Sequence, residues 1–227
     1  MINIAIDGPA GAGKSTIAKA ISRIIGIIYL DTGAMYRTVA LKAIRTGVDT
    51  RDGERLAALV KDIDIKIEYK DNEQRIFLDG DEVTESIRTP DVSIGASNVA
   101  VIPAVRMKMV ELQREIARSS DVVMDGRDIG TYVLPDANFK FFLTASLDER
   151  AKRRYDEMIS RGMPDVDYEE VKRDIAFRDK NDSSRAFAPL SKAPDALMID
   201  TTGIEPQEVL RIILDKIENN ETDGADK

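Results

Sequence analysis

A chain of 227 residues fits one large domain with a small insert, and this one carries 33 basic and 41 acidic side chains, for a formal net charge of −8. It contains no cysteine, histidine or tryptophan, which excludes disulfides, Cys/His metal sites, thiol nucleophiles and Ser-His-Asp triads. The acidic balance argues against nucleic acid or an anionic membrane as a partner, so local Arg and Lys clusters must bind any anionic ligand.

The first predicted elements are a buried strand over residues 2–6 and, after a glycine-rich segment, a helix with Ile17, Ile21 and Ile24 on one face. The segment between them has the spacing G-x-x-x-x-G-K-S, which points backbone N–H groups inward at phosphate. Lys14 would add charge toward the β- and γ-phosphates, and Ser15 would ligate Mg²⁺. The predicted nucleotide-binding residues are Gly8, Pro9, Ala10, Gly11, Ala12, Gly13, Lys14, Ser15 and Thr16. The alternative is an incidental glycine-rich turn.

A second buried strand is predicted over residues 27–30, followed by a helix over residues 34–45. Arg37 lies one turn into this helix, just past the carboxyl end of the strand. Because open α/β sheets bind ligands at that edge, Arg37 is either a ligand contact or a solvated helix residue.

The next stretch changes from helical to extended patterning. Residues 53–62 are helical in character, whereas apolar and polar residues alternate over residues 63–69. Residues 75–78 would pair with them as an antiparallel hairpin, and a short extended piece is expected at residues 82–84. We interpret the β-rich stretch over residues 63–100 as an insert beside the ligand cleft.

Pro103 opens the next predicted helix, which has an apolar stripe for packing on the sheet. A third buried strand, over residues 122–125, ends in Asp125 and leads directly into a Gly-Arg-Asp sequence. An apolar strand that ends in Asp is typical of the Walker B pattern, in which the carboxylate reaches Mg²⁺ or its waters. The alternative is that Asp125 is an ordinary turn residue.

A fourth strand, over residues 139–143, precedes a long helix in which Arg150, Arg153 and Arg154 share one face. The loop over residues 160–168 then leads into a second helix. Basic residues on both sides of this loop predict a lid, at about residues 155–168, that closes over phosphates and excludes water. The alternatives are an ordinary connection and a solvated arginine face.

The second of these helices ends in charges of both signs, at Arg178, Asp179, Asp182 and Arg185. They either hold the hydroxyl and phosphate groups of a ligand or form a surface ion-pair patch. A fifth strand is predicted over residues 196–199 and a closing helix over residues 205–217. The polar residues 219–227 are predicted to be disordered.

Five segments, taken together and in order, resemble the bacterial cytidylate kinase family: GPAGAGKST, LDTGAMYR, ASNVA, DGRDIGT and RDKNDSSRAFAPL. The resemblance runs from about residue 2 to residue 217. It implies the P-loop nucleoside monophosphate kinase fold, an α/β fold with a five-stranded parallel sheet flanked by helices. Residues 1–62 and 101–218 would then form the core, and residues 63–100 the monophosphate-binding insert.

The resemblance also implies an activity, the transfer of a phosphoryl group from ATP, bound with Mg²⁺, to CMP or dCMP. The glycine-rich segment and the lid residues Arg150, Arg154 and Arg161 would hold ATP. The matching positions for the acceptor phosphate are Thr32, Arg37, Arg127 and Arg185, those for the base are Ser97, Arg106 and Asp128, and those for the sugar are Arg178 and Asp182. Lys14, Arg127, Arg154 and Arg185 are then the expected catalytic residues, and Ser15 and Asp125 the expected metal ligands.

Two other classes of protein share the phosphate-binding pattern. A GTP-dependent switch predicts an N-K-x-D motif, which is absent, and residues 180–182 have similar letters in the wrong order. A shikimate- or uridylate-type kinase of the same fold remains an alternative, separable by its acceptor. No apolar run approaches the roughly 20 residues of a membrane span. We therefore expect a cytoplasmic monomer with small-molecule partners and no nucleic-acid or membrane partner.

Overall fold

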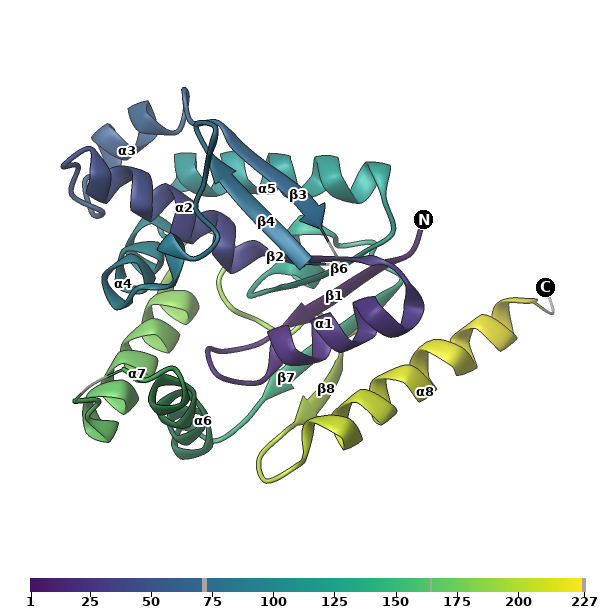
Figure 1. The fold of residues 1–227 in the computed structure, drawn as a ribbon. Helices are drawn as coiled ribbons and strands as arrows, with labels where there is room; N and C mark the ends of the chain where they lie inside the picture. Colours follow the sequence, from purple (N-terminus) through teal and green to yellow (C-terminus); the bar gives the residue numbers. More distant parts are fainter. Residues whose placement is uncertain (71–72, 164, 226–227) are drawn as a thin grey trace.

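The computed structural model describes residues 1–70, 73–163 and 165–225, and a five-stranded parallel sheet lies at its centre (Figure 1). In spatial order the strands are β2 (Ile28–Asp31), β6 (Val122–Gly126), β1 (Asn3–Asp7), β7 (Phe139–Thr144) and β8 (Leu197–Asp200). Each strand lies within one residue of its predicted bounds. The predicted α/β fold is confirmed.

Apolar side chains cover both faces of the sheet, because successive residues of a strand point to opposite sides. Ile4 and Ile6 of β1 belong to one buried cluster, and Ala5 between them belongs to another. The covering helices are α1 (Lys14–Ile25) and α8 (Pro206–Ala225) on one face, and α2 (Thr32–Arg45) and α5 (Pro103–Ser119) on the other. Helices therefore sandwich the sheet and leave its carboxyl edge for the loops.

Short local signals start the helices that surround this edge. α1 follows Gly13, whose φ of 84° lies in the left-handed region that favours glycine. The Asp31 carboxylate caps α2 by accepting a hydrogen bond from the backbone N–H of Ala34. The Ser146 hydroxyl and the Asp167 carboxylate do the same for the hairpin of α6 (Leu147–Ser160) and α7 (Tyr168–Ser184).

A second sheet, three-stranded and antiparallel, comes between α2 and α5 in the chain. It consists of β3 (Ile65–Lys70), β4 (Glu73–Leu78) and β5 (Asp81–Glu82), and it is preceded by α3 (Gly53–Leu59). The predicted hairpin is confirmed. Its buried residues Ile76 and Leu78 share one core cluster with α2 and α5, so the hairpin packs on the body of the molecule.

The second half of the predicted β-rich stretch is helical. After η1 (Ser86–Arg88) comes α4 (Pro90–Val99), which the sequence did not predict. Its start signals are the Thr89 hydroxyl, which accepts from Val92 N–H, and Pro90 in the first turn. Where α4 packs closely on α2, it carries small residues such as Gly95 in place of a stripe of large apolar side chains. Without that stripe the helical period is hard to detect in the sequence.

Other boundaries also differ from the prediction. The helix predicted over residues 53–62 ends at Leu59, and a short π-helix, η2 (Ile129–Val133), was not predicted. The closing helix, α8, runs to Ala225, and the disordered tail over residues 219–227 stays a prediction. The predicted turn at residues 71–72, Pro164 of the predicted lid loop and residues 226–227 lie outside the described residues. Within the described part of the chain, no helix is both long and apolar enough for a bilayer crossing.

Candidate active site

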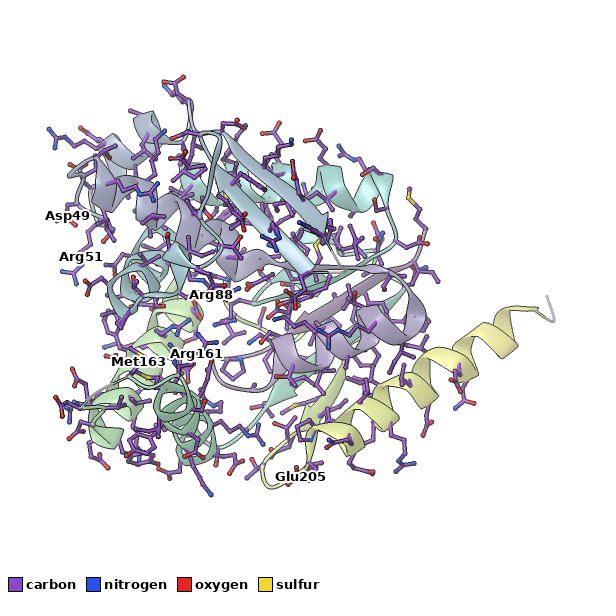
Figure 2. The ribbon with its side chains drawn as sticks, in the orientation of Figure 1. Asp49, Arg51, Arg88, Arg161, Met163 and Glu205 are labelled. Carbon is purple, nitrogen blue, oxygen red and sulfur yellow. The ribbon has the colours of Figure 1, made fainter. Side chains whose placement is uncertain are left out.

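A cavity of about 1370 Å³ lies at the carboxyl edge of the central sheet, between the phosphate-loop side, the insert and the α6–α7 hairpin. Twelve basic and eight acidic side chains line it, although the chain as a whole has more acidic than basic residues. Arg88 comes from the insert side and Arg161 from the end of α6 (Figure 2). The site therefore concentrates positive charge in an acidic molecule.

The glycine-rich segment has the backbone of a phosphate-binding loop. Gly8 has a φ of 146°, and a Cβ there would collide with the carbonyl oxygen of Leu143 on β7. Gly11 and Gly13 also have positive φ values, 77° and 84°. Lys14 is buried and its Nζ donates to the Pro9 carbonyl at 2.7 Å, so the side chain curls back over the loop. Burial, followed by the charge of Arg127, lowers the pKa of Lys14 to about 7.

The end of β2 holds two arginines through one carboxylate. Asp31 Oδ2 accepts from Arg37 at 2.8 Å and from Arg88 at 3.3 Å. Burial raises the pKa of Asp31, but the two guanidinium groups outweigh it and hold that pKa below its usual range. Arg37 and Arg88 are thus brought together at the cavity wall, one from α2 and one from η1.

The loop after β6 carries a second and more deeply buried set of charges. Asp128 pairs with Arg106 of α5 through one carboxylate oxygen and with Arg185 through the other, at 3.2 Å. Arg106 is only 1% exposed. A buried arginine requires such a partner, and Asp128 in turn can orient both guanidinium groups. The predicted base-reading residues Arg106 and Asp128 are therefore in direct contact.

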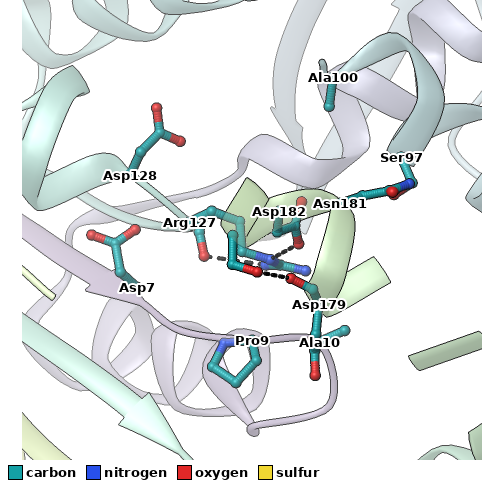
Figure 3. Close-up of polar contacts among 12 residues, drawn as sticks. Asp7, Pro9, Ala10, Ser97, Ala100, Arg127, Asp128, Asp179, Asn181 and Asp182 are labelled. Carbon is teal, nitrogen blue, oxygen red and sulfur yellow. Dashed lines mark hydrogen bonds and ion pairs between the residues drawn. The ribbon is translucent and has the colours of Figure 1, made fainter. Parts of the chain in front are cut away.

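Arg127, next in the chain to Asp128, turns toward α7. Its Nε donates to Asp182 Oδ2 at 2.6 Å, and Asp182 also lies 3.6 Å from Arg185 (Figure 3). Arg178 lines the same space but forms no ion pair with any residue in the described ranges. Burial and the nearby charge of Arg127 lower the pKa of Arg178 to about 10. Its charge is available for an anionic or hydroxyl-bearing ligand.

Asp125, the predicted Walker B carboxylate, is positioned by β2. The Tyr29 hydroxyl donates to Asp125 Oδ1 at 2.9 Å, and the Thr32 hydroxyl donates to the Asp125 carbonyl oxygen at 2.7 Å. Burial, with the charge of Asp31 next, raises the pKa of Asp125 to about 6. Ser15 and Asp125 line one cavity, and a hydroxyl with a carboxylate is a donor set that Mg²⁺ accepts when phosphates complete its shell.

Asp7 is a buried carboxylate that joins the phosphate loop to the loop after β6. It ends β1, and its two oxygens accept hydrogen bonds from Ile129 N–H at 2.8 Å and Gly130 N–H at 2.7 Å. Only 3% of the residue is exposed. Burial raises its pKa to about 6 despite these two hydrogen bonds. Asp7 therefore fixes the turn immediately after Arg127 and Asp128.

Most residues predicted for the site line the cavity. These are Ala10, Gly11, Ala12, Gly13, Lys14, Ser15, Thr16, Thr32, Arg37, Ser97, Arg106, Asp125, Arg127, Asp128, Arg154, Arg161, Arg178, Asp182 and Arg185. Gly8, Pro9 and Arg150 do not line it. Arg150 instead lies beneath the phosphate loop, where its side chain is almost fully buried. Its predicted contact with ATP stays a prediction.

The structure also adds residues that the sequence reasoning missed. Arg88 and Arg153 line the cavity, and Arg153 donates to the Thr201 carbonyl oxygen at 2.6 Å and to its hydroxyl at 3.0 Å. Asp7 and Asp31 had a usable signal, because each is the last residue of a buried strand, and Asp125 is the last but one of β6. Arg88 had none, since η1 carries no recognisable pattern.

A phosphate loop after the central strand of a parallel sheet, opening into an arginine-rich cavity, defines a P-loop nucleotide-binding protein. Solved structures share the fold: an uncharacterised protein from Eubacterium ventriosum (TM-score 0.54, 15% identical, covering 96% of this chain and 99% of that one) and a shikimate kinase from Bacteroides thetaiotaomicron (TM-score 0.50, 13% identical, covering 96% and 98%). At such identities the likeness concerns the fold alone.

Sequence comparison is more specific. The family model for cytidylate kinase matches residues 4–219. The chain is 49% identical to a cytidylate kinase from Caldicellulosiruptor bescii, over 97% of this chain and 98% of that protein. It is 52% identical to one from Pelotomaculum thermopropionicum, over 95% of each. The chain belongs to the cytidylate kinase family, and the predicted resemblance is confirmed.

Proposed function

We propose that this protein transfers the γ-phosphoryl group of ATP to CMP or dCMP, giving ADP and CDP or dCDP. The observation that carries the proposal is one cavity that joins the phosphate loop to the buried Arg106–Asp128–Arg185 cluster, in a member of the cytidylate kinase family. The phosphate loop would hold the donor, and the cluster would hold the acceptor.

Recognition of cytosine would depend on Asp128. A carboxylate held between Arg106 and Arg185 is an acceptor that cannot rotate freely, and it would take the exocyclic amine that cytosine has and uracil lacks. Ser97 on α4 lines the same cavity. Asp182 and Arg178 would face the sugar and phosphate.

The chemistry needs no dedicated base. An anionic oxygen of the acceptor phosphate attacks the γ-phosphorus of ATP in line, the new P–O bond forms, and the bond to the β-bridging oxygen breaks as ADP leaves. Lys14, Arg127, Arg154 and Arg185 would neutralise the charge spread over the transferring group. Mg²⁺, held by Ser15 and Asp125 together with the phosphates, would supply further charge neutralisation. Arg37 and Arg88 would offset the repulsion between the two nucleotides.

The experiment that tests this function is an ADP-release assay with Mg²⁺ and ATP over CMP, dCMP, UMP, AMP, GMP and shikimate. We expect CMP and dCMP to give the highest kcat/KM. Faster turnover of UMP would overturn the role given to Asp128, and turnover of shikimate in place of CMP would overturn the acceptor class. Tight retention of GDP with no acceptor-dependent release of ADP would overturn the enzyme assignment.

A further inference from the structure

Helix α7 presents two carboxylates, Asp179 and Asp182, to two different parts of the site. They are three residues apart and so lie on one side of the helix. Asp182 pairs with Arg127 at 2.6 Å on the acceptor side. Asp179 Oδ2 pairs with Arg150 at 2.6 Å, and Asp179 lies close to Ala10 of the phosphate loop (Figure 3). One turn of α7 therefore contacts both the acceptor side of the site, through Asp182, and the phosphate-loop side, through Asp179.

Arg150 extends the contact from Asp179 into the phosphate loop. Its NH1 donates to the Ala10 carbonyl oxygen at 3.0 Å, and its Nε donates to the Ala145 carbonyl oxygen at 2.9 Å. Its backbone and Cβ also crowd Gly11, where an added Cβ would lie 3.0 Å away. The residue is only 6% exposed, so its charge depends on the carboxylate of Asp179. We call the ion pair Arg150–Asp179, with the bond to Ala10, the latch.

The hairpin that carries the latch is packed separately from the rest of the molecule. Ala151, Val171 and Ile175 form an apolar cluster of their own, distinct from the two clusters on the sheet. Polar contacts join the hairpin to the body, and besides the latch they include Arg127–Asp182 and the Asn181 amide, which donates to the Ser97 hydroxyl at 3.5 Å. A unit held by such contacts can shift as a whole when a ligand changes them.

The two carboxylates of α7 have separate partners. Asp179 pairs with Arg150 beneath the phosphate loop, whereas Asp182 pairs with Arg127 on the acceptor side. Substituting Asp182 would disturb the proposed acceptor contacts themselves, whereas Asp179 does not line the cavity.

We propose that the latch couples the two nucleotide sites, so that fixing α7 by an acceptor at Arg127 and Asp182 orders the phosphate loop and tightens donor binding. Asp179 and Arg150 are positioning residues in this account. The inference rests on the proposed function, because it needs both nucleotides to bind. By thermodynamic reciprocity, the donor must tighten acceptor binding by the same factor.

The test measures the dissociation constant of a non-hydrolysable ATP analogue with Mg²⁺ by calorimetry, alone and with saturating CMP. In the unsubstituted protein we expect CMP to tighten the analogue by about fivefold or more. Asp179→Asn keeps the size of the side chain and removes its charge, and should bring this factor close to one while leaving the affinity for CMP alone unchanged. Asp179→Glu should restore most of the factor.

Asp174→Asn is the matched control, because Asp174 lies on the same helix, is exposed, and pairs with no residue in the described ranges. In this variant, CMP should tighten binding of the ATP analogue by the same factor as in the unsubstituted protein. Full coupling in Asp179→Asn, no coupling in the unsubstituted protein, or equal loss of CMP and analogue affinity would each overturn the latch. Failure of the proposed function can be told apart from failure of the latch, because the unsubstituted protein would then show no CMP-dependent release of ADP.

Discussion

At the scale of single residues, the site consists of charges that hold one another in place before any ligand arrives. Asp31 forms ion pairs with Arg37 and Arg88, and Asp128 forms ion pairs with Arg106 and Arg185. Arginine suits this arrangement because its planar fork keeps free donors after one edge is paired. A phosphate that enters therefore meets guanidinium groups whose positions are already fixed, and little side-chain entropy is lost on binding.

The first prediction concerns the choice of base. Asp128→Asn replaces a carboxylate that only accepts with an amide that also donates, so uracil gains a partner and cytosine loses one. We expect the ratio of kcat/KM for CMP to that for UMP to fall by about tenfold or more. Because CMP and UMP carry the same sugar and phosphate, effects of the substitution on folding or on phosphate binding cancel in this ratio. A uniform loss for both acceptors would show that Asp128 acts only on folding or on the phosphate.

The second prediction concerns Asp7. Asparagine offers one accepting oxygen to two N–H groups, so Asp7→Asn leaves either Ile129 or Gly130 N–H without its partner. We expect a loss of about 1–3 kcal/mol in the free energy of unfolding in urea. The KM for CMP should also rise, because the turn after Asp128 is released.

Asp121→Asn is the control for this substitution. Within the described residues the Asp121 carboxylate accepts one hydrogen bond, from Ile2 N–H at 2.7 Å, and an amide oxygen can take over that bond. Its variant should keep both stability and the KM for CMP. If both substitutions changed the free energy of unfolding and the KM for CMP equally, the two hydrogen bonds that Asp7 accepts would have no specific role in the site.

The third prediction concerns the proton on Lys14. Its pKa of about 7 in the free protein leaves most of the side chain neutral at about pH 8. Bound polyphosphate supplies negative charge and raises the pKa, so binding must take up a proton. We expect calorimetry of a non-hydrolysable ATP analogue, in buffers of different ionisation enthalpy, to show net uptake at about pH 8 that declines toward pH 6. Lys14→Arg, which stays charged, should abolish the uptake, and equal uptake in both proteins would refute the assignment.

At the scale of elements, the sequence predicted the central sheet well because its strands are short apolar runs that begin or end at turn-forming residues such as Gly, Asp and Asn. Ile4 and Ile6 are buried on one face of the sheet and Ala5 on the other, as the alternation of a strand requires. Helix α4 and the π-helix η2 were missed for physical reasons. α4 uses small residues where it meets α2. In η2, the N–H groups of Ile129 and Gly130 donate hydrogen bonds to the Asp7 carboxylate, 122 and 123 positions earlier in the chain, and no local pattern records such a contact.

The same reasoning indicates which residues of the site are predictable. The glycine-rich loop and Asp125 have local signatures at the ends of strands, so both could be read from the sequence. The burial of Arg150 under the loop could not be read from the sequence, because it depends on how α6 docks after β7. Arg88 joins the site through Asp31, a residue 57 positions away in the chain.

The fourth prediction concerns the contact between α4 and α2. A Cβ on Gly95 would lie 3.1 Å from Ala40 Cβ and 3.2 Å from Thr50 Cγ2, and Ala40 has no room to move. Gly95→Ala gains about 0.5–1 kcal/mol of helix propensity but pushes α4 away from α2, which displaces Ser97. We expect the KM for CMP to rise severalfold with an unchanged KM for ATP. Ile94→Ala, at a neighbouring exposed position, should change neither constant, and a normal KM for CMP in Gly95→Ala would contradict this account.

At the scale of the whole molecule, the charge distribution is inverted between surface and site. The chain has a net charge of −8, whereas basic side chains outnumber acidic ones by twelve to eight around the cavity. A cleft lined by one sign of charge focuses field lines and raises the local concentration of oppositely charged small ligands. That nucleic acid is not a partner stays a prediction from the acidic balance of the chain.

The last prediction follows from this inversion. Raising the salt concentration from about 50 to about 500 mM shortens the screening length from roughly 14 to 4 Å, so the attraction between the arginine-lined cavity and a phosphate weakens. We expect the KM for CMP to rise severalfold over this range. Cytidine, which has the same base and sugar but no phosphate, is the matched control, and its inhibition constant against CMP should change little. If cytidine and CMP responded equally to salt, the effect would lie in folding or in the base site, and the basic lining of the cavity would not be what attracts the acceptor.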